Sequence, residues 1–110
     1  MKKVNILGTE YTIEIKSKEE DKFLEKCDGY CDKTAHKIVV ISEPEDSELQ
    51  NFGEYQKKVI RHEIIHAFLC ESGLQENFKH EEWGHDETII DWIAIQFPKM
   101  LKVFQEAQCI

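Results

Sequence analysis

The pattern His-Glu-x-x-His, formed by His62, Glu63 and His66, is the segment of this chain best suited to chemistry. Residues four apart on a helix lie one turn apart on the same face, so the two imidazoles can reach a single zinc ion. Glu63 is one helical step round, and we expect its carboxylate to point past the metal toward a bound water. Zinc lowers the pKa of such a water to about 7, and a nearby carboxylate can accept its proton. The pattern predicts a zinc-dependent hydrolase with Glu63 as general base.

A catalytic zinc site also requires a third protein ligand and one open position. The downstream sequence offers several donors: His80, His85, Asp86, Glu87 and Asp91. We favour Glu87, because Asp91 lies one helical turn further on and can bind the second ring nitrogen of a histidine ligand. His85 is the alternative third ligand, since imidazole suits zinc at least as well. His80 and His36 have polar neighbours in sequence, and we expect both to be solvated.

Arg-His-Glu-Ile-Ile-His-Ala-Phe, followed by Asp-Glu-Thr-Ile-Ile-Asp-Trp-Ile-Ala, resembles the gluzincin arrangement of thermolysin-like peptidases. It is still more similar to the minimal zinc peptidase-like proteins of phages and prophages that are related to the ImmA/IrrE group. The resemblance implies a zincin-like metallopeptidase domain with a zinc ion bound by His62, His66 and Glu87. It also implies that Glu63 is the general base and that Asp91 orients His62.

The resemblance leaves catalytic competence and the scissile bond open. Full-size gluzincins supply a downstream His or Tyr to stabilise the oxyanion, whereas this chain has no Tyr after Tyr55. His36, His80, His85 and the tyrosines of the first half remain possible donors. One alternative function is a non-catalytic zinc-binding interaction or regulatory module, in which His85 and Glu87 together close the coordination sphere. Another is hydrolysis of a different amide or an ester.

Two long helices are expected to carry these residues. Apolar residues recur at helical spacing over 52–72, between a capping Asn51 and a terminating Gly73. A second helix is predicted from about Asp86, and Pro98 is expected to break or kink it. Its inward side chains are predicted to be Ile89, Ile90, Ile93, Ala94 and Phe97. Trp83 and Trp92 are expected in the core, and Arg61 in a surface salt bridge.

The first half of the chain predicts a small sheet. Residues 4–7 and 11–15 are short alternating runs that indicate a β-hairpin, and the apolar run 37–42 predicts a strand buried on both faces. This last strand can be a central strand, or an edge to which a peptide adds. Residues 18–27 indicate a short helix or a loop, and Gly29 a turn. The order predicts an α+β fold in which a small, mostly antiparallel sheet packs on two long helices.

Length and charge limit the partners of this chain. Its 110 residues predict a single domain, and 22 acidic against 14 basic residues give a formal net charge of −8. Such a surface repels phosphate backbones and anionic membranes, so we expect a neutral or basic peptide or protein substrate and neither nucleic acid nor membrane. The absence of a long apolar run predicts a cytoplasmic protein. Oligomeric state and further protein partners stay open.

Overall fold

The four strands of this protein form one mixed sheet in the order β1-β2-β4-β3. The computed structural model describes residues 1–73 and 86–110. Its strands are β1 (Lys2–Ile6), β2 (Thr9–Lys16), β3 (Gly29–Asp32) and β4 (Lys37–Ile41). The β1–β2 and β3–β4 pairs are antiparallel, whereas β2 and β4 run parallel. The predicted α+β class, with a small and mostly antiparallel sheet, is confirmed.

The strand β4 lies inside the sheet and is buried on both faces, as its apolar run predicts. Ile38 and Val40 belong to one hydrophobic cluster, and Val39 and Ile41 belong to another. This alternation places successive side chains on opposite faces of the sheet. The suggestion that this strand is an edge open to peptide addition is wrong, because β2 and β3 flank it. The edge position on that side of the sheet is taken by β3.

The strand β3 was not anticipated, since Gly29 was expected to mark a turn. Instead Gly29 begins the strand, and its backbone pairs with Val40 of β4. The strand has only four residues, all half-buried, and such a short segment shows no clear alternation of apolar and polar residues. Pairing with the buried β4 is what stabilises its extended conformation. Between β2 and β3, residues Lys22–Glu25 form a 3₁₀ helix (η1), whose Leu24 is buried against the second cluster.

The helix α1 (Phe52–Ser72) begins and ends where its sequence predicts. The Asn51 side chain accepts a hydrogen bond of 3.2 Å from the backbone N–H of Glu54. At the other end Gly73 adopts a left-handed conformation with φ of 86°, and its N–H donates to the carbonyl of Cys70. The helix packs on the sheet, where it contacts β1, β3 and β4.

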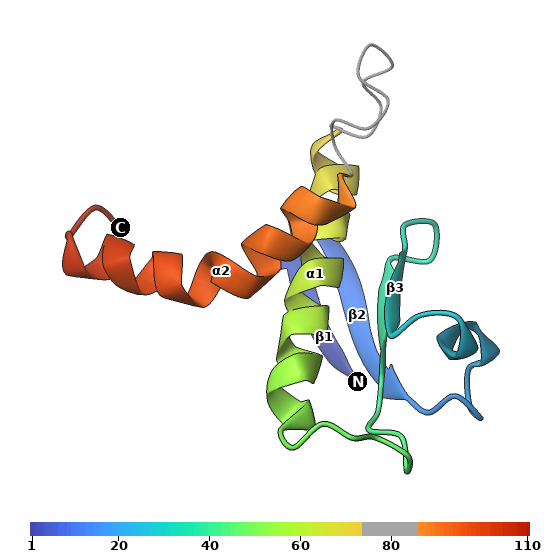
Figure 1. Cartoon of the computed structure of the whole chain (residues 1–110). Helices are drawn as coiled ribbons and strands as arrows, with labels where there is room; N and C mark the ends of the chain where they lie inside the picture. The colour runs from blue at the N-terminus through green and yellow to red at the C-terminus, as the bar shows by residue number, and fades with distance from the viewer. Residues whose placement is uncertain (74–85) are drawn as a thin grey trace.

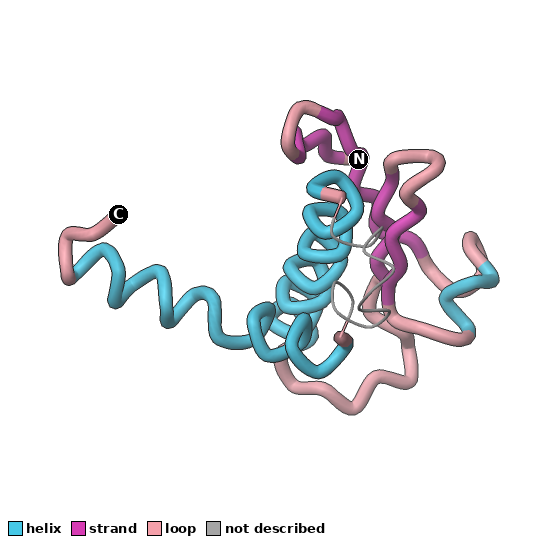
Figure 2. The backbone as a smooth tube through the Cα atoms, turned by 90° about the horizontal axis from the view of Figure 1, so that it is seen from above, coloured by secondary structure: helices cyan, strands magenta, loops and turns pink. Residues whose placement is uncertain are grey.

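The helix α2 (Glu87–Glu106) lies across α1 and then extends away from the sheet (Figure 1). Viewed from above, both helices lie on the same side of the sheet (Figure 2). The Asp86 side chain accepts a hydrogen bond of 3.1 Å from the backbone N–H of Ile89 and caps the helix. Pro98 lies inside α2, so of the two expected effects, a break or a kink, the break does not occur. No described helix is long and apolar enough to cross a membrane.

The buried stripe of α2 is narrower than its apolar pattern predicts. Ile90 and Ala94, one turn apart, are fully buried. Ile89, Trp92 and Phe97 are exposed, so the prediction that they point inward is wrong. The reason is that α2 packs chiefly on α1, and a contact between two helices buries only one stripe of each. Trp83 lies outside the described residues.

Candidate metal centre

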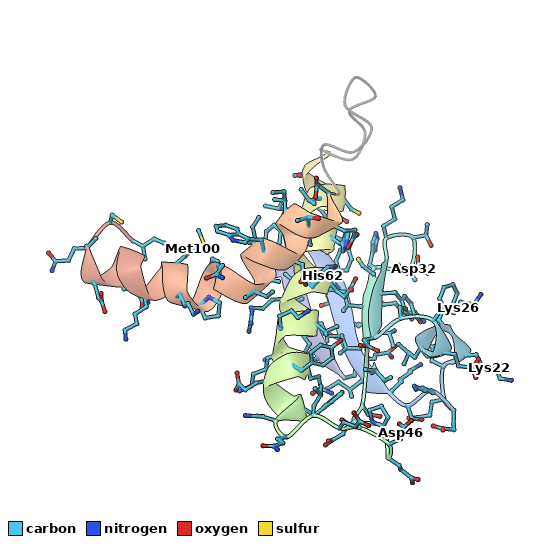
Figure 3. The ribbon with its side chains drawn as sticks, in the orientation of Figure 1. Lys22, Lys26, Asp32, Asp46, His62 and Met100 are labelled. Carbon is cyan, nitrogen blue, oxygen red and sulfur yellow. The ribbon has the colours of Figure 1, made fainter. Side chains whose placement is uncertain are left out.

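Two adjacent stripes of α1 position the residues of the His-Glu-x-x-His pattern. Val59, Glu63 and Ala67 are four apart and form the stripe that packs on the sheet, which explains why Glu63 is buried. His62 and His66 directly precede Glu63 and Ala67 in the sequence, so they lie on the adjacent face of the helix. Both line a cleft of about 840 Å³ that β3, α1 and the start of α2 enclose. Figure 3 places the His62 side chain on α1, on the side toward β3.

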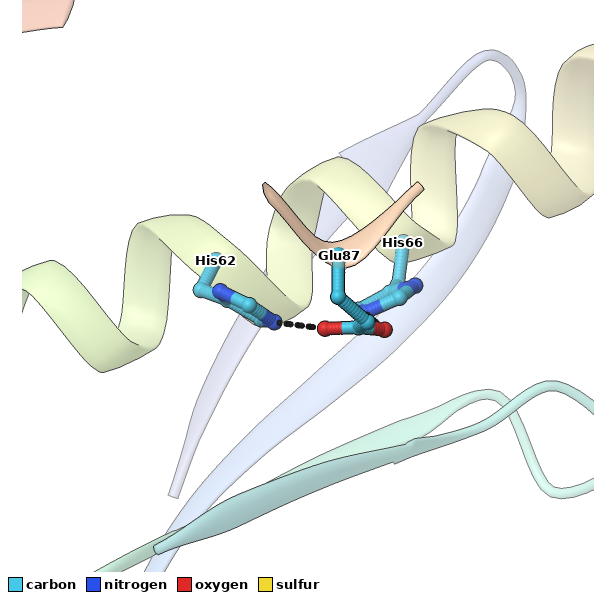
Figure 4. Close-up of side chains that lie close together, drawn as sticks. All are labelled: His62, His66 and Glu87. Carbon is cyan, nitrogen blue, oxygen red and sulfur yellow. Dashed lines mark hydrogen bonds and ion pairs between the residues drawn. The ribbon is translucent and has the colours of Figure 1, made fainter. Parts of the chain in front are cut away.

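Glu87, in the first turn of α2, lies between the two imidazoles (Figure 4). Its Oε2 is 3.0 Å from Nε2 of His62, and its Oε1 is 3.0 Å from Nε2 of His66. Within the described residues, these three side chains form the group that could hold a metal, with one ligand atom of each within 4.8 Å of the others. The structure therefore brings the three predicted ligands together, whereas His85 and His80 lie outside the described residues.

The donor set and spacing of this group fit a zinc ion. Zinc binds imidazole nitrogen and carboxylate oxygen at about 2.0–2.2 Å, which separates neighbouring ligand atoms of a tetrahedral site by about 3.3 Å. In the structure, one Glu87 carboxylate oxygen lies 3.0 Å from Nε2 of His62, and the other lies 3.0 Å from Nε2 of His66. One ligand atom from each of the three side chains lies within 4.8 Å of the others, which is close enough for them to surround one ion. Three ligands of this kind are also the number that a catalytic zinc site uses.

Asp91 holds the ring of His62 from the far side. Its Oδ1 lies 3.1 Å from Nδ1 of His62, so Nε2 is the nitrogen that faces Glu87. The same Oδ1 accepts a hydrogen bond of 3.0 Å from Nζ of Lys58. Burial disfavours the charge on Asp91, but the hydrogen bonds from Lys58 and His62 outweigh it, and the pKa of Asp91 is lowered. This is the orienting contact that the Glu-x-x-x-Asp spacing suggests.

Glu63 is the buried charged residue of the described core, with 7% of its surface exposed. Burial raises its pKa to about 7; the positive charge that His62 can carry opposes this shift, and the Glu87 carboxylate adds to it. The backbone of β3 covers the side chain closely at Gly29. A β-carbon on that glycine would lie 3.4 Å from Cγ of Glu63 and only 2.8 Å from Cγ1 of Val59. A larger residue at position 29 would therefore force β3 away from α1.

Neither tyrosine of the cleft offers a free hydroxyl for an oxyanion. Tyr30 and Tyr55 line the cleft, but the Tyr30 hydroxyl donates to Asp21 and the Tyr55 hydroxyl donates to Asp28. His36, another residue considered for this role, lies beside the ring of Tyr11, with ring centroids 5.3 Å apart, and is not among the cleft residues.

Sequence reasoning missed two basic residues of α1 that connect to α2. Lys58 reaches Asp91, as described above. Arg61, expected in a salt bridge, instead donates from Nε to the backbone carbonyl of Ala94 at 2.6 Å. The i, i+4 spacing from Lys58 to His62 would have placed both on one face of the helix, but it could not identify a partner on α2.

Comparisons of this chain with protein-family models, curated proteins and solved structures found no match. The positions of the side chains around Glu87 are therefore the main guide to function.

Proposed function

We propose that this protein is a zinc-dependent peptidase, in which His62, His66 and Glu87 hold the metal and Glu63 is the general base. One observation carries the proposal: two imidazole nitrogens and a carboxylate from separate helices converge within 4.8 Å at the wall of an open cleft. Each imidazole nitrogen lies 3.0 Å from a carboxylate oxygen of Glu87. A buried acid follows the first histidine in the sequence.

The residues around this centre have complementary tasks. When bound, zinc would polarise the scissile carbonyl and lower the pKa of a water molecule. Glu63 would take the proton of that water and pass it to the leaving amine. Its burial and raised pKa suit the carboxyl both to accept a proton and to release it. Asp91 would keep the ring of His62 in the tautomer that offers Nε2 to the metal.

The walls of the cleft support an extended peptide as the substrate. The strand β3 is an edge strand, and its residues line the cleft opposite α1. Edge strands offer backbone hydrogen-bonding groups to which an extended peptide can add. Acidic residues, Asp28 and Asp32 among them, outnumber the lysines in the lining of this cleft, which favours a neutral or basic peptide over an acidic one.

The alternative function is a non-catalytic zinc-binding interaction module. The engaged hydroxyls of Tyr30 and Tyr55 favour it, since neither is poised to stabilise an oxyanion. In that case a fourth protein group, such as His85, would close the coordination sphere.

Zinc analysis and cleavage assays with a matched pair of variants separate these functions. Glu63→Gln removes the proposed base, and Glu54→Gln changes an exposed glutamate on the same helix. The peptidase proposal predicts one zinc per chain in all three proteins, with cleavage of a peptide library by wild type and Glu54→Gln only. Zinc without cleavage by the wild type would support the interaction module, and absence of zinc would refute both.

A further inference from the structure

Lys58 is linked to the candidate metal centre through a shared carboxylate oxygen. Its Nζ lies 3.0 Å from Oδ1 of Asp91, and the same oxygen lies 3.1 Å from Nδ1 of His62. Lys58 precedes His62 by four residues, so both donors project from one face of α1 toward an acceptor on α2. The link thus crosses the interface between the two helices that supply the metal-binding side chains.

Asp91 needs such a restraint because its carboxylate is partly exposed. Its side chain is 38% exposed, whereas that of Lys58 is 24% exposed. A carboxylate with access to water can rotate away from the imidazole, whereas one held by a second donor cannot do so without losing both hydrogen bonds. The ammonium of Lys58 is itself held 5.2 Å from the ring centroid of Tyr55, within range of a cation–π interaction.

We propose that Lys58 is a positioning residue, which fixes Asp91 so that His62 presents Nε2 to the zinc ion. This inference rests on the proposed zinc site. It extends the hydrogen-bonded chain behind the metal ligand His62 from Asp91 to Lys58. Groups that orient a ligand histidine commonly change metal affinity by about 10–100-fold when they are removed. Lys58 acts one step further out, so we expect the lower end of this range.

Lys58 can influence zinc binding in two opposite ways, and the direction of the change in zinc affinity distinguishes them. If Lys58 acts only as a nearby positive charge, its removal should strengthen zinc binding, since like charges repel. If it positions Asp91, its removal should weaken zinc binding. Lys58→Met removes the charge and the donor while it keeps most of the apolar stem, and Lys58→Arg keeps both charge and donor.

Zinc affinity, measured by competition with a chromophoric chelator, provides the test. We expect about tenfold weaker binding for Lys58→Met and a value within about threefold of wild type for Lys58→Arg. Lys57→Met is the control, because Lys57 is the adjacent residue and pairs at 3.2 Å with the exposed Glu54. We expect it to bind zinc as wild type does. Far-UV circular dichroism of the metal-free proteins establishes that each variant folds.

A double-mutant cycle with Asp91→Asn tests the route of the effect. If Lys58 acts through Asp91, Lys58→Met should cause less than a twofold change when position 91 is already Asn. The same tenfold loss in both backgrounds, or unchanged or tighter binding by Lys58→Met alone, would overturn this inference and leave the zinc site intact. Should Lys58→Met not fold, Lys58→Leu replaces it in the same cycle. A wild-type protein that binds no zinc would overturn the proposed function as well.

Discussion

Burial of the Glu63 carboxyl should make the metal-free protein less stable as the pH rises. The ordinary pKa of this group is 4.5, and the folded structure raises it to about 7, mainly by burial. Between these values the folded protein holds a proton that the unfolded chain has released, so the free energy of unfolding falls with increasing pH. At about 1.4 kcal/mol for each pH unit, the loss reaches about 3 kcal/mol by pH 8.

Glu63→Gln removes this titration and keeps the size of the side chain. The metal-free variant should match wild type within about 0.5 kcal/mol at pH 4.5 and exceed it by about 3 kcal/mol at pH 8. Urea unfolding in the presence of a chelator, followed by circular dichroism, measures both values. Groups that titrate in both proteins largely cancel in the difference. Glu54→Gln, at an exposed site, should follow wild type at each pH. Equal stability of Glu63→Gln and wild type at pH 8 would refute the reasoning.

Three further predictions follow from contacts around the cleft and the core. Gly29→Ala should lower the free energy of unfolding by about 1–3 kcal/mol in urea, because its β-carbon would lie 2.8 Å from Val59; an unchanged midpoint would contradict this. Tyr11→Phe should cost about 1–2 kcal/mol in thermal unfolding, since it removes a buried hydroxyl that donates to Glu71 at 3.0 Å. Burial raises the pKa of Cys31 to about 12, so iodoacetamide at pH 8 should alkylate it at least about tenfold more slowly in the folded protein than in urea, as mass spectrometry would measure.

The elements that could be predicted from the sequence are those with local signals at both ends. The bounds of α1 follow from a capping Asn51 and a left-handed Gly73, and both features act within one helical turn. The β1–β2 hairpin likewise follows from two alternating runs around a tight turn. The strand β3 has no such signal, since pairing with β4 rather than its own pattern makes it a strand.

In the candidate site too, some residues are placed by local helix geometry and others by the packing of the two helices. His62, Glu63 and His66 share one helix, so their relative placement follows from helical geometry alone. The approach of Glu87 depends on how α2 crosses α1, which the buried stripe of α2 and the hydrogen bond from Arg61 to the Ala94 carbonyl determine. Apolar spacing predicted that this stripe exists but overestimated its width. The link from Lys58 to Asp91 could not be foreseen, because most lysines on helices extend into water.

A crystal of the zinc-loaded protein, measured on both sides of the zinc absorption edge, tests the central claim most directly. We predict one anomalous peak per chain, at about 2.0–2.2 Å from Nε2 of His62, from Nε2 of His66 and from a carboxylate oxygen of Glu87. A peak bound to other residues, or no peak among these three side chains at saturating zinc, would contradict the account.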